Sequence, residues 1–292
     1  MALRVLSGLE VSKQVYSQLI QKISILKSKN VVPGLAVVLV GNNPASEIYV
    51  RSKTKKFKDL KLNSTTIKVD SSVSEDKLIQ IVNELNNDQK YHGILVQLPL
   101  PDHIDKNNVI NSIDPKKDVD GFHPENAGLL SIGKPRFIPC TPKGIIRLLK
   151  FYNLSLNGQH VVIIGRSNLV GRPISILTSS SGKMLNGTTT ICHSRTKDLS
   201  SYTKSADVLI SAIGKSEFFT SKDIKKDAVL IDVGINKINS NNSKGYKIVG
   251  DFKWNAINEL ASGATPVPGG IGPMTIAMLV ENTVLAAEIH SS

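Results

Sequence analysis

The sequence predicts an α/β protein with two doubly wound domains. Three observations support this fold class. The chain has 292 residues, about twice the length of a typical domain. Strand-length apolar blocks alternate with amphipathic blocks, and strands so uniformly apolar are expected to be covered on both faces of a parallel sheet. The alternation restarts near residue 160 with a strand, a glycine-containing turn and a helix, the order found in nucleotide-binding domains.

The first half of the chain alternates helices and strands up to residue 96. The apolar run Leu35–Val40 ends at Gly41-Asn42-Asn43-Pro44, a combination typical of a turn. The expected elements, in order, are a helix at Val11–Leu26, a strand at Leu35–Val40, a helix at Ala45–Leu60, a strand at Thr65–Val69, a helix at Ser74–Leu85 and a strand at Gly93–Val96.

The Pro-rich middle of the chain predicts ordered loops, and a second α/β unit follows it. Residues 97–101 and 118–124 are expected at the carboxyl edge of the first sheet, and Pro142 suits the first turn of a bridging helix. The expected elements are a helix at Lys143–Phe151, strands at Val161–Ile164, Thr189–Cys192, Val208–Ser211 and Val229–Val233, a polar turn at Asn239–Gly245, a loop at Thr265–Pro273 and a helix at Thr275–His290.

Composition narrows the class of protein. Lys and Arg number 36 against 24 Asp and Glu, so the net charge of +12 predicts affinity for anions. Only 5% of residues are aromatic, which leaves few platforms for stacking nucleic-acid bases.

Cys140 and Cys192 form no disulfide framework and no zinc motif. No apolar run is long enough to span a membrane, and the histidines are not spaced as metal ligands. We expect a soluble cytoplasmic protein without a metal.

The segment Gly165-Arg-Ser-Asn-Leu-Val-Gly171 follows a strand and opens a helix. Glycines permit the tight turn, and free amides at a helix N-terminus favour phosphate. The next strand ends without the acidic residue that NAD enzymes usually carry there. It ends instead with Ser194 and Arg195, which together with Arg166 suit the additional phosphate of NADP. The alternative is that both arginines are solvated surface residues.

A second cluster of polar residues predicts the chemical site. Ser46, Tyr49 and Lys53 share one face of the expected helix, and a partly desolvated lysine can act as a base or polarising group. Gln97 follows an apolar strand, where open α/β sheets place ligand contacts. Asp120 follows Asp118 in a turn that can direct a carboxylate inward. The alternatives are a solvated helix face for the lysine and turn capping for both aspartates.

Six motifs, taken in order, resemble one family over essentially the whole chain. They resemble the bifunctional methylenetetrahydrofolate dehydrogenase/methenyltetrahydrofolate cyclohydrolases. The motifs are Gly41–Lys53, Val96–Pro101, Lys117–Pro124, Pro139–Pro142, Gly165–Pro173 and Thr265–Thr275. The segment 178–187 is longer than is usual in this family, which affects the register of Ser194 and Arg195.

The resemblance implies a fold and a reaction. It implies a folate cleft between a catalytic domain (1–141 and 273–292) and a Rossmann-like NADP-binding domain (142–272), with the last helix returning to the catalytic domain. It implies oxidation of methylenetetrahydrofolate with NADP, followed by hydrolysis of methenyltetrahydrofolate to 10-formyltetrahydrofolate. It also implies a homodimer formed through the nucleotide domain.

The resemblance also assigns roles to residues. The catalytic group comprises Lys53, Gln97, Tyr49 and Asp120. The folate-binding group comprises Tyr49, Ser46, Asp120, Pro266, Val267, Gly269 and Gly270. The NADP-binding group comprises Gly165, Arg166, Ser167, Asn168, Gly171, Ser194, Arg195 and Ile235.

Three alternatives stand beside this prediction. A shikimate-type NADP-dependent dehydrogenase shares the two-domain architecture and a Lys–Asp pair, but the Tyr49-x-x-x-Lys53 helix disfavours it. A monofunctional dehydrogenase without cyclohydrolase activity is disfavoured because both Lys53 and Gln97 are present. A basic binding protein, for nucleic acid or another partner, would show salt-sensitive retention on nucleic acid without binding NADP.

Overall fold

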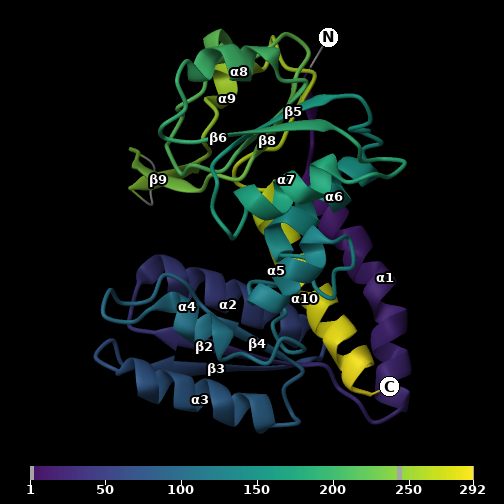
Figure 1. Cartoon of the computed structure of the whole chain (residues 1–292), viewed down its shortest axis with the longest axis vertical. Coiled ribbons are helices and arrows are strands. Elements are labelled where there is room, and N and C mark those ends of the chain that lie inside the picture. The colour runs from purple at the N-terminus through teal and green to yellow at the C-terminus, as the bar shows by residue number, and fades with distance from the viewer. Residues whose placement is uncertain (1–2, 242–244, 292) are drawn as a thin grey trace. The chain divides into compact units, whose positions relative to one another are not determined.

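The structure is a computed structural model that describes residues 3–241 and 245–291. The chain forms two compact units (Figure 1). We call them the six-stranded unit (Met1–Lys13 and Thr141–Thr275) and the three-stranded unit (Gln14–Cys140 and Ile276–Ser292) after their sheets. Each unit has a parallel sheet, as the sequence predicts.

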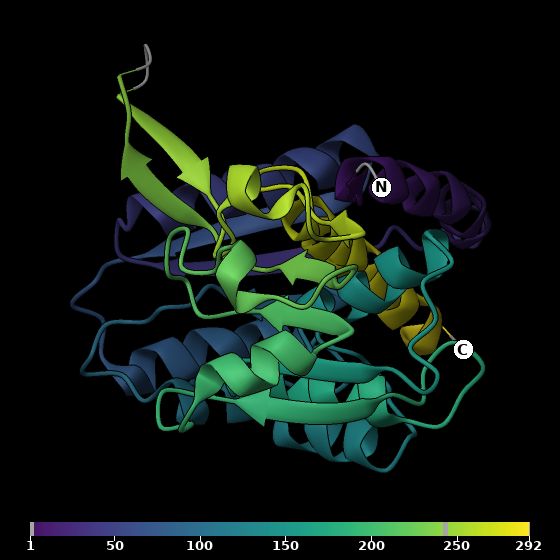
Figure 2. The same cartoon turned by 90° about the horizontal axis from the view of Figure 1, so that it is seen from above.

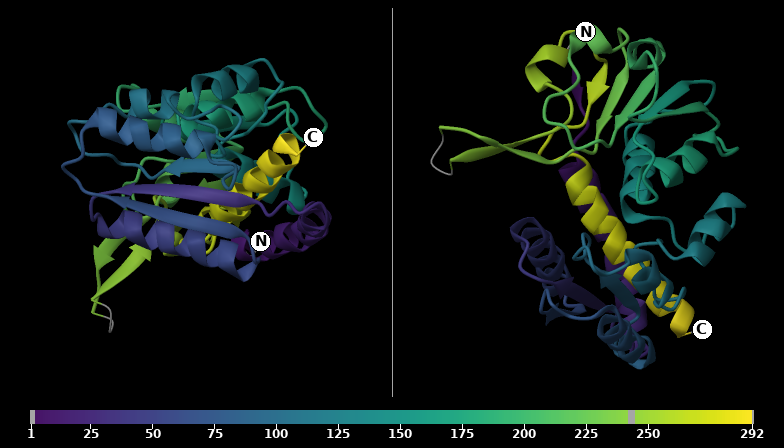
Figure 3. Two further views of the ribbon diagram at one scale, coloured as in Figure 1. Left: turned by 90° about the horizontal axis from the view of Figure 1, so that it is seen from below. Right: turned by 60° about the vertical axis from the view of Figure 1, so that its left-hand side comes forward.

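The three-stranded unit is built on the strand order β3-β2-β4 (Figure 3). Its strands are β2 (Gly34–Val40), β3 (Asn63–Val69) and β4 (Gly93–Val96), and all pairings are parallel. All residues of β2 and β4 are buried, which confirms the interpretation of their continuous apolar sequence. The pairs Val38–Val96 and Val40–Val69 set the register, so Gly41, Asp70 and Gln97 all follow the carboxyl ends of strands.

Helices cover both faces of this sheet. The helices α3 (Glu75–Asn87) and α4 (Lys106–Asn111) contribute Leu78, Val82 and Val109 to a core with Val38 and Ile94. The helix α2 (Pro44–Asp59) lies on the opposite face (Figure 1). The short helix α5 (Pro124–Ser131) follows the 118–123 loop.

The six-stranded unit has the strand order β1-β11-β8-β7-β5-β6. All of its pairings are parallel. The chain runs from β5 to β6 on one side and then to β7 on the other, so the strand order reverses between β5 and β7. The strands are β1 (Arg4–Val5), β5 (His160–Ile164), β6 (Thr188–Cys192), β7 (Val208–Ser211), β8 (Val229–Asp232) and β11 (Gly263–Ala264).

One face of this sheet packs on short helices. Val162, Leu209 and Leu230 form a core with Phe219 and Phe252. The helical elements on this face are α8 (Leu199–Ser205), the 3₁₀ turn Ser221–Asp223 and α9 (Trp254–Ile257), whereas α7 (Gly171–Ser179) lies on the opposite face (Figure 1).

An antiparallel hairpin of β9 (Asn236–Asn239) and β10 (Tyr246–Val249) leaves the carboxyl end of β8 (Figure 2). The polar turn predicted at 239–245 connects these strands, and its residues 242–244 lie outside the described part of the chain.

The boundaries that divide the sequence into the two units fall within three helices, α1 (Gly8–Ser28), α6 (Cys140–Phe151) and α10 (Ile271–His290). The sequence pattern predicts each of them with a later start. The six-stranded unit includes residues 1–13, which the sequence prediction assigned to the other domain. The reason is β1, which pairs with β11 through bonds from Arg4 N to Ser262 O (3.0 Å) and from Leu6 N to Ala264 O (2.8 Å). Among the described residues, no helix has the length and apolar character needed to cross a membrane.

Candidate functional site

Lys53 lies on the buried stripe of α2. Ser46, Val50, Lys53 and Phe57 recur at spacings of three and four residues, and their exposed fractions are 4%, 4%, 8% and 0%. The neighbouring Lys55 and Lys58 are exposed. The sequence prediction singled out Lys53 among the lysines of this helix, and burial separates it from Lys55 and Lys58.

Gln97 is the hydrogen-bond partner of Lys53. The Nζ atom of Lys53 donates to Oε1 of Gln97 at 3.0 Å. The Nε2 atom of Gln97 donates to Leu98 O at 2.8 Å, and the Gln97 backbone N–H donates to Val38 O at 2.9 Å. These two bonds fix the amide so that its oxygen faces the ammonium group. The structure therefore joins two predicted site residues from different elements, α2 and the carboxyl end of β4.

Tyr49 and Ser46 flank Lys53 on the same helix. Tyr49 is half-buried, and burial raises the pKa of its phenol. The phenol therefore stays protonated near neutrality and can donate a hydrogen bond. Ser46 is held near the start of α2, where its backbone N–H donates to Oδ1 of Asn43 at 3.1 Å.

The two aspartates of the 118–120 turn have different environments. Asp118 is 1% exposed, and its Oδ2 accepts bonds from His123 N and Asn126 Nδ2, each at 2.8 Å. Burial raises the pKa of Asp118. Asp120 is half-buried, and its carboxylate accepts no hydrogen bond from the described residues. Asp118 therefore caps the turn, whereas the Asp120 carboxylate is free to bind a ligand.

The loop that carries Asp120 is held by two asparagines that sequence reasoning missed. Asn126, fully buried, also donates to Pro115 O (2.9 Å) and accepts from Arg136 Nη1 (3.1 Å). Asn282 on α10, also fully buried, donates to Val119 O (2.8 Å) and Ile138 O (3.0 Å). Asparagines are common in loops, so only their partners, distant in sequence, reveal this role.

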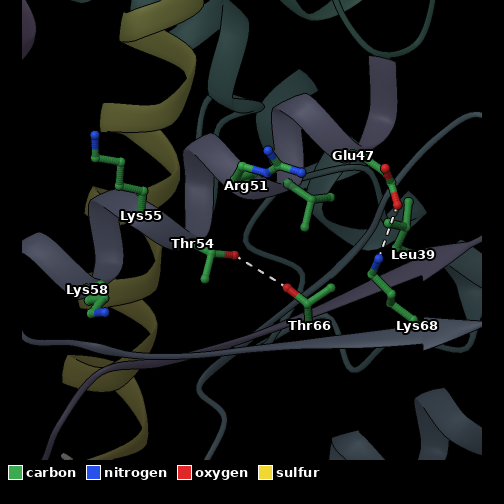
Figure 4. A pocket seen from close by; sticks show the side chains of 9 residues that line it. Leu39, Glu47, Arg51, Thr54, Lys55, Lys58, Thr66 and Lys68 are labelled. Carbon is green, nitrogen blue, oxygen red and sulfur yellow. Dashed lines mark hydrogen bonds and ion pairs between the residues drawn. The ribbon is translucent and has the colours of Figure 1, made fainter. Parts of the chain in front are cut away.

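A separate basic pocket lies beside α2 and the edge strand β3 (Figure 4). Its volume is about 450 Å³. In the figure Lys68 pairs with Glu47, and Thr54 contacts Thr66. The pocket is lined by Leu39, Glu47, Val50, Arg51, Thr54, Lys55, Lys58, Thr66 and Lys68. It does not include Ser46, Tyr49 or Lys53, which occupy a different face of the helix.

In the six-stranded unit, the predicted phosphate turn joins β5 to α7. Gly165 has φ of +116°, a conformation that favours glycine. A Cβ atom on Gly171 would collide with Gly165 O, so both glycines are required for the close approach of strand and helix. Ser167 Oγ accepts from Val170 N at 3.1 Å, and Arg166, Ser167 and Asn168 are exposed in the turn that precedes α7. The turn therefore presents backbone and polar groups where a dinucleotide phosphate would bind.

Ser194 and Arg195 lie just beyond the carboxyl end of β6. Cys192 pairs with Ile164, which places the residues after β6 beside the Gly165 turn. The longer segment 178–187 precedes β6 at the amino edge of the sheet, where Gly187 N donates to Thr178 O at 2.9 Å. The strand pairing therefore sets the register at Ser194. Arg195 is exposed, and its backbone N–H donates to His193 Nδ1 at 3.2 Å.

Two further predicted segments meet the same edge of this sheet. Ile235, which follows β8, is 45% exposed although it is apolar. The loop 266–270 follows β11, and Thr265 Oγ1 accepts from Asp232 N at 2.7 Å. Gly269 has φ of +107°, and its carbonyl accepts from Leu9 N at 3.1 Å. Pro266, Val267, Gly269 and Gly270 thus belong to a tightly anchored loop.

The fold and the polar groups at the carboxyl edges of the two sheets define a class of protein. It is a two-domain α/β enzyme with a nucleotide-binding turn and a buried lysine. Comparison with known proteins identifies the family. Residues 6–120 match the tetrahydrofolate dehydrogenase/cyclohydrolase catalytic domain, and residues 139–291 match the NAD(P)-binding domain of the same family. The chain belongs to the tetrahydrofolate dehydrogenase/cyclohydrolase family.

Individual relatives match this chain over nearly its full length. The bifunctional protein FolD of Chlorobium chlorochromatii is 48% identical over 96% of each chain. The crystal structure of the bifunctional FolD dehydrogenase/cyclohydrolase of Campylobacter jejuni has a TM-score of 0.91 at 44% identity, covering 99% of this chain and 100% of that one. The Trypanosoma brucei enzyme, complexed with NADP cofactor and an inhibitor, has a TM-score of 0.94 at 32% identity, covering 100% and 99%. Family membership decides against the shikimate-type and binding-protein alternatives.

Proposed function

We propose that the chain oxidises methylenetetrahydrofolate to methenyltetrahydrofolate with NADP and then hydrolyses methenyltetrahydrofolate to 10-formyltetrahydrofolate. The family membership supports both activities. The observation that carries the proposal is the buried Lys53 bonded to Gln97, which lies in the catalytic domain of a chain that also has an NAD(P)-binding domain. The same pair favours the bifunctional enzyme over a monofunctional dehydrogenase.

Lys53 is the proton-transfer and polarising group of the hydrolysis. The Lys53 residue is 8% exposed, and its Nζ atom donates to the neutral amide of Gln97; among the described residues, no carboxylate forms an ion pair with it. As a neutral amine, Lys53 can accept the proton released by the water that attacks the one-carbon unit, and the resulting ammonium group can donate that proton when the ring opens. The phenol of Tyr49, on the same helix, can donate a hydrogen bond to the substrate. Ring opening of the hydrated product then gives 10-formyltetrahydrofolate.

The folate is bound by polar and loop residues. The free carboxylate of Asp120 can accept two parallel hydrogen bonds from the amino and ring N–H groups of the pterin. Ser46 and Tyr49 contact the folate from α2. The loop residues Pro266, Val267, Gly269 and Gly270 form a further folate contact.

When bound, NADP supplies the hydride acceptor. The Gly165–Gly171 turn suits a dinucleotide. Its backbone segments approach so closely that neither glycine could carry a Cβ atom, as in other dinucleotide-binding turns. Arg166 and Arg195 are exposed and available for the 2′-phosphate. The remaining contacts come from the residues Ser167, Asn168, Ser194 and Ile235.

The proposal extends to assembly and location. We expect a homodimer formed through the six-stranded unit and a cytoplasmic protein, both supported by the family resemblance. Gel filtration with light scattering tests the assembly, because a monomeric mass at micromolar concentration contradicts it.

Two assays on the purified protein test the reaction. The first follows NADPH formation from methylenetetrahydrofolate, and the second follows disappearance of added methenyltetrahydrofolate. We expect both to exceed the spontaneous rates. Absence of NADPH formation contradicts the dehydrogenase, whereas methenyltetrahydrofolate decay at its spontaneous rate identifies a monofunctional dehydrogenase.

A further inference from the structure

We propose that Asp251 is a positioning residue for the cofactor: its buried carboxylate holds the loop after β7 (residues 212–215) in the conformation that receives NADP. This inference rests on the proposed function. Asp251 follows β10 and belongs to none of the motifs used above. It acts on the cofactor through the loop, with its partner Asp232.

The Asp251 carboxylate collects four hydrogen bonds from two neighbouring segments. Asp251 is 0% exposed. Its Oδ2 accepts from Ser211 Oγ (2.7 Å) and Ile213 N (3.0 Å), and its Oδ1 accepts from Lys215 N (2.9 Å) and Asn236 Nδ2 (3.3 Å). Three of the four donors belong to the end of β7 or to the loop after it. One side chain therefore fixes the path of that loop.

Asp232 fixes Asp251 in turn. The Oδ1 of Asp232 accepts from Gly234 N and Asp251 N, and its Oδ2 accepts from Phe252 N, each at 2.9 Å. The two aspartates are packed reciprocally. A Cβ atom on Gly234 would collide with the Asp251 carboxylate, and one on Gly250 would collide with the Asp232 carboxylate. The ends of β7, β8 and β10 are thereby tied together.

The burial of the Asp232 and Asp251 carboxylates beside each other is electrostatically unfavourable. Burial and the nearby Asp251 raise the pKa of Asp232 to about 7, although three backbone N–H groups act in the opposite direction. Apolar side chains of similar volume commonly stabilise a protein interior as well as or better than buried charges do. A pair of buried aspartates suits a requirement for one defined loop conformation better than a requirement for stability.

The loop held by Asp251 lies at the position where an open α/β sheet binds its ligand. Strand order reverses between β5 and β7, and ligands bind at the carboxyl ends of strands at such a point. A Cβ atom on Gly165 would lie 2.8 Å from Ala212 O, so the loop after β7 directly abuts the phosphate turn. Gly214, with φ of +63°, is exposed in this loop. A shift of residues 212–215 would therefore alter the wall against which NADP packs.

Asp251→Asn tests the proposal, with Asp207→Asn as the matched control. The substitution keeps the volume but turns an amide toward two donors. Asp207 lies in the same unit at the opposite, amino end of β7, where its carboxylate accepts from His160 N (2.8 Å) and Lys225 Nζ (2.5 Å). The measurements are the Kd for NADP from the fluorescence of Trp254, the KM for NADP and the cyclohydrolase rate.

We expect Asp251→Asn to raise the Kd and KM for NADP about tenfold or more, while the cyclohydrolase rate stays within about twofold of wild type. Ser211→Ala removes one of the four donors and should raise both constants by about threefold. This variant keeps the proposal testable if Asp251→Asn fails to fold. Asp207→Asn should leave both constants unchanged.

Unchanged Kd and KM in Ser211→Ala and Asp251→Asn overturn the proposal. So does a loss of cyclohydrolase activity in Asp251→Asn equal to its loss of NADP affinity, since that result indicates only a general structural role. A wild-type protein that binds NADP without oxidising methylenetetrahydrofolate contradicts the proposed function instead, and the Kd comparison still tests Asp251.

Discussion

The two parallel sheets present their functional edges in different ways. At the edge of the three-stranded sheet, Lys53 is buried and bonded to Gln97 through side chains, at 3.0 Å. At the edge of the six-stranded sheet, Arg166 and Arg195 are exposed, and the backbone of the surrounding loops is held by buried groups such as Asp251. One edge is defined by the placement of a few side chains, and the other by the conformation of the backbone.

Because of this difference, we expect mutations at the two edges to have different effects on activity. Loss of a buried reactive side chain removes chemistry outright, whereas loss of an exposed contact or a loop anchor weakens binding by a graded amount. The cyclohydrolase reaction should therefore depend most on the first edge. The dehydrogenase reaction should depend on both, because it needs the cofactor as well as the folate.

Lys53→Met should have the largest effect. We expect it to lower the cyclohydrolase rate by about 100-fold or more, because general acid–base groups contribute about 10² to 10⁴. Dehydrogenase activity should fall less, since the hydride acceptor belongs to the cofactor. Loss of methenyltetrahydrofolate absorbance measures the effect. Lys55→Met is the matched control on the same helix, where the side chain is exposed, and it should behave like wild type. Equal losses in the two variants would contradict the role of burial.

Gln97→Leu should act in the same direction more weakly. It removes the hydrogen-bond acceptor of Lys53, a buried residue, and leaves its Nζ atom without that partner. We expect a decrease in cyclohydrolase rate of about tenfold, together with a lower melting temperature. Gln97→Glu retains an acceptor and should restore the melting temperature. If Gln97→Leu retains the wild-type cyclohydrolase rate, Lys53 does not depend on Gln97 for its orientation.

Replacement of Arg195 by Gln should change cofactor preference rather than rate. A charge-assisted bond to the 2′-phosphate of NADP is absent with NAD, so we expect kcat/KM for NADP to fall about tenfold and that for NAD to stay nearly constant. Steady-state kinetics with both cofactors measure the change. Lys204→Gln, an exposed cation at the end of α8, serves as control. Equal decreases for the two cofactors would show that Arg195 does not contact the additional phosphate.

The smallest expected effect concerns stability at low pH. His92 Nδ1 accepts from Gly34 N at 3.1 Å, and burial lowers the pKa of His92, with the charges of His290 and Lys117 acting in the same direction. The unfolded chain therefore takes up a proton at this residue near pH 6.5 before the folded chain does. As a result, the stability from neutral His92 is present above that pH and is lost as the pH falls through it.

The His92→Asn variant retains an acceptor near Gly34 N but does not titrate. Between pH 7.5 and 5.5 its melting temperature should fall by about 2 °C less than that of wild type, as measured by scanning calorimetry. His103→Asn, at an exposed position, should follow wild type. Parallel curves for wild type and His92→Asn would exclude His92 as a source of pH dependence.

The same contrast explains how far the sequence could be interpreted. The strands β2 and β4 are buried along their whole length, so their apolar sequence was a sufficient signal. Lys53 and Gln97 could be chosen because each lies at a recognisable place, a helix face and a strand end. The glycines of the phosphate turn carry a local conformational requirement that sequence displays directly.

Other features depend on partners that are distant in the chain. Asp251 holds Ile213, 38 residues away, and Asn282 holds Val119, 163 residues away. Asp232 and Asn126 carry no local pattern that distinguishes them from ordinary turn residues. The two-residue strand β1 is too short for a periodic signal, so its pairing with β11 could not be predicted from the sequence.

The ratio of cyclohydrolase to dehydrogenase activity tests the central claim most directly. We would measure it at subsaturating NADP in wild type, Lys53→Met and Asp251→Asn from the same preparation scheme. The ratio should fall in Lys53→Met and rise in Asp251→Asn, because each variant damages a different edge. A ratio that moves in the same direction in both variants, or in neither, contradicts the division of chemistry and cofactor positioning between the two sheets.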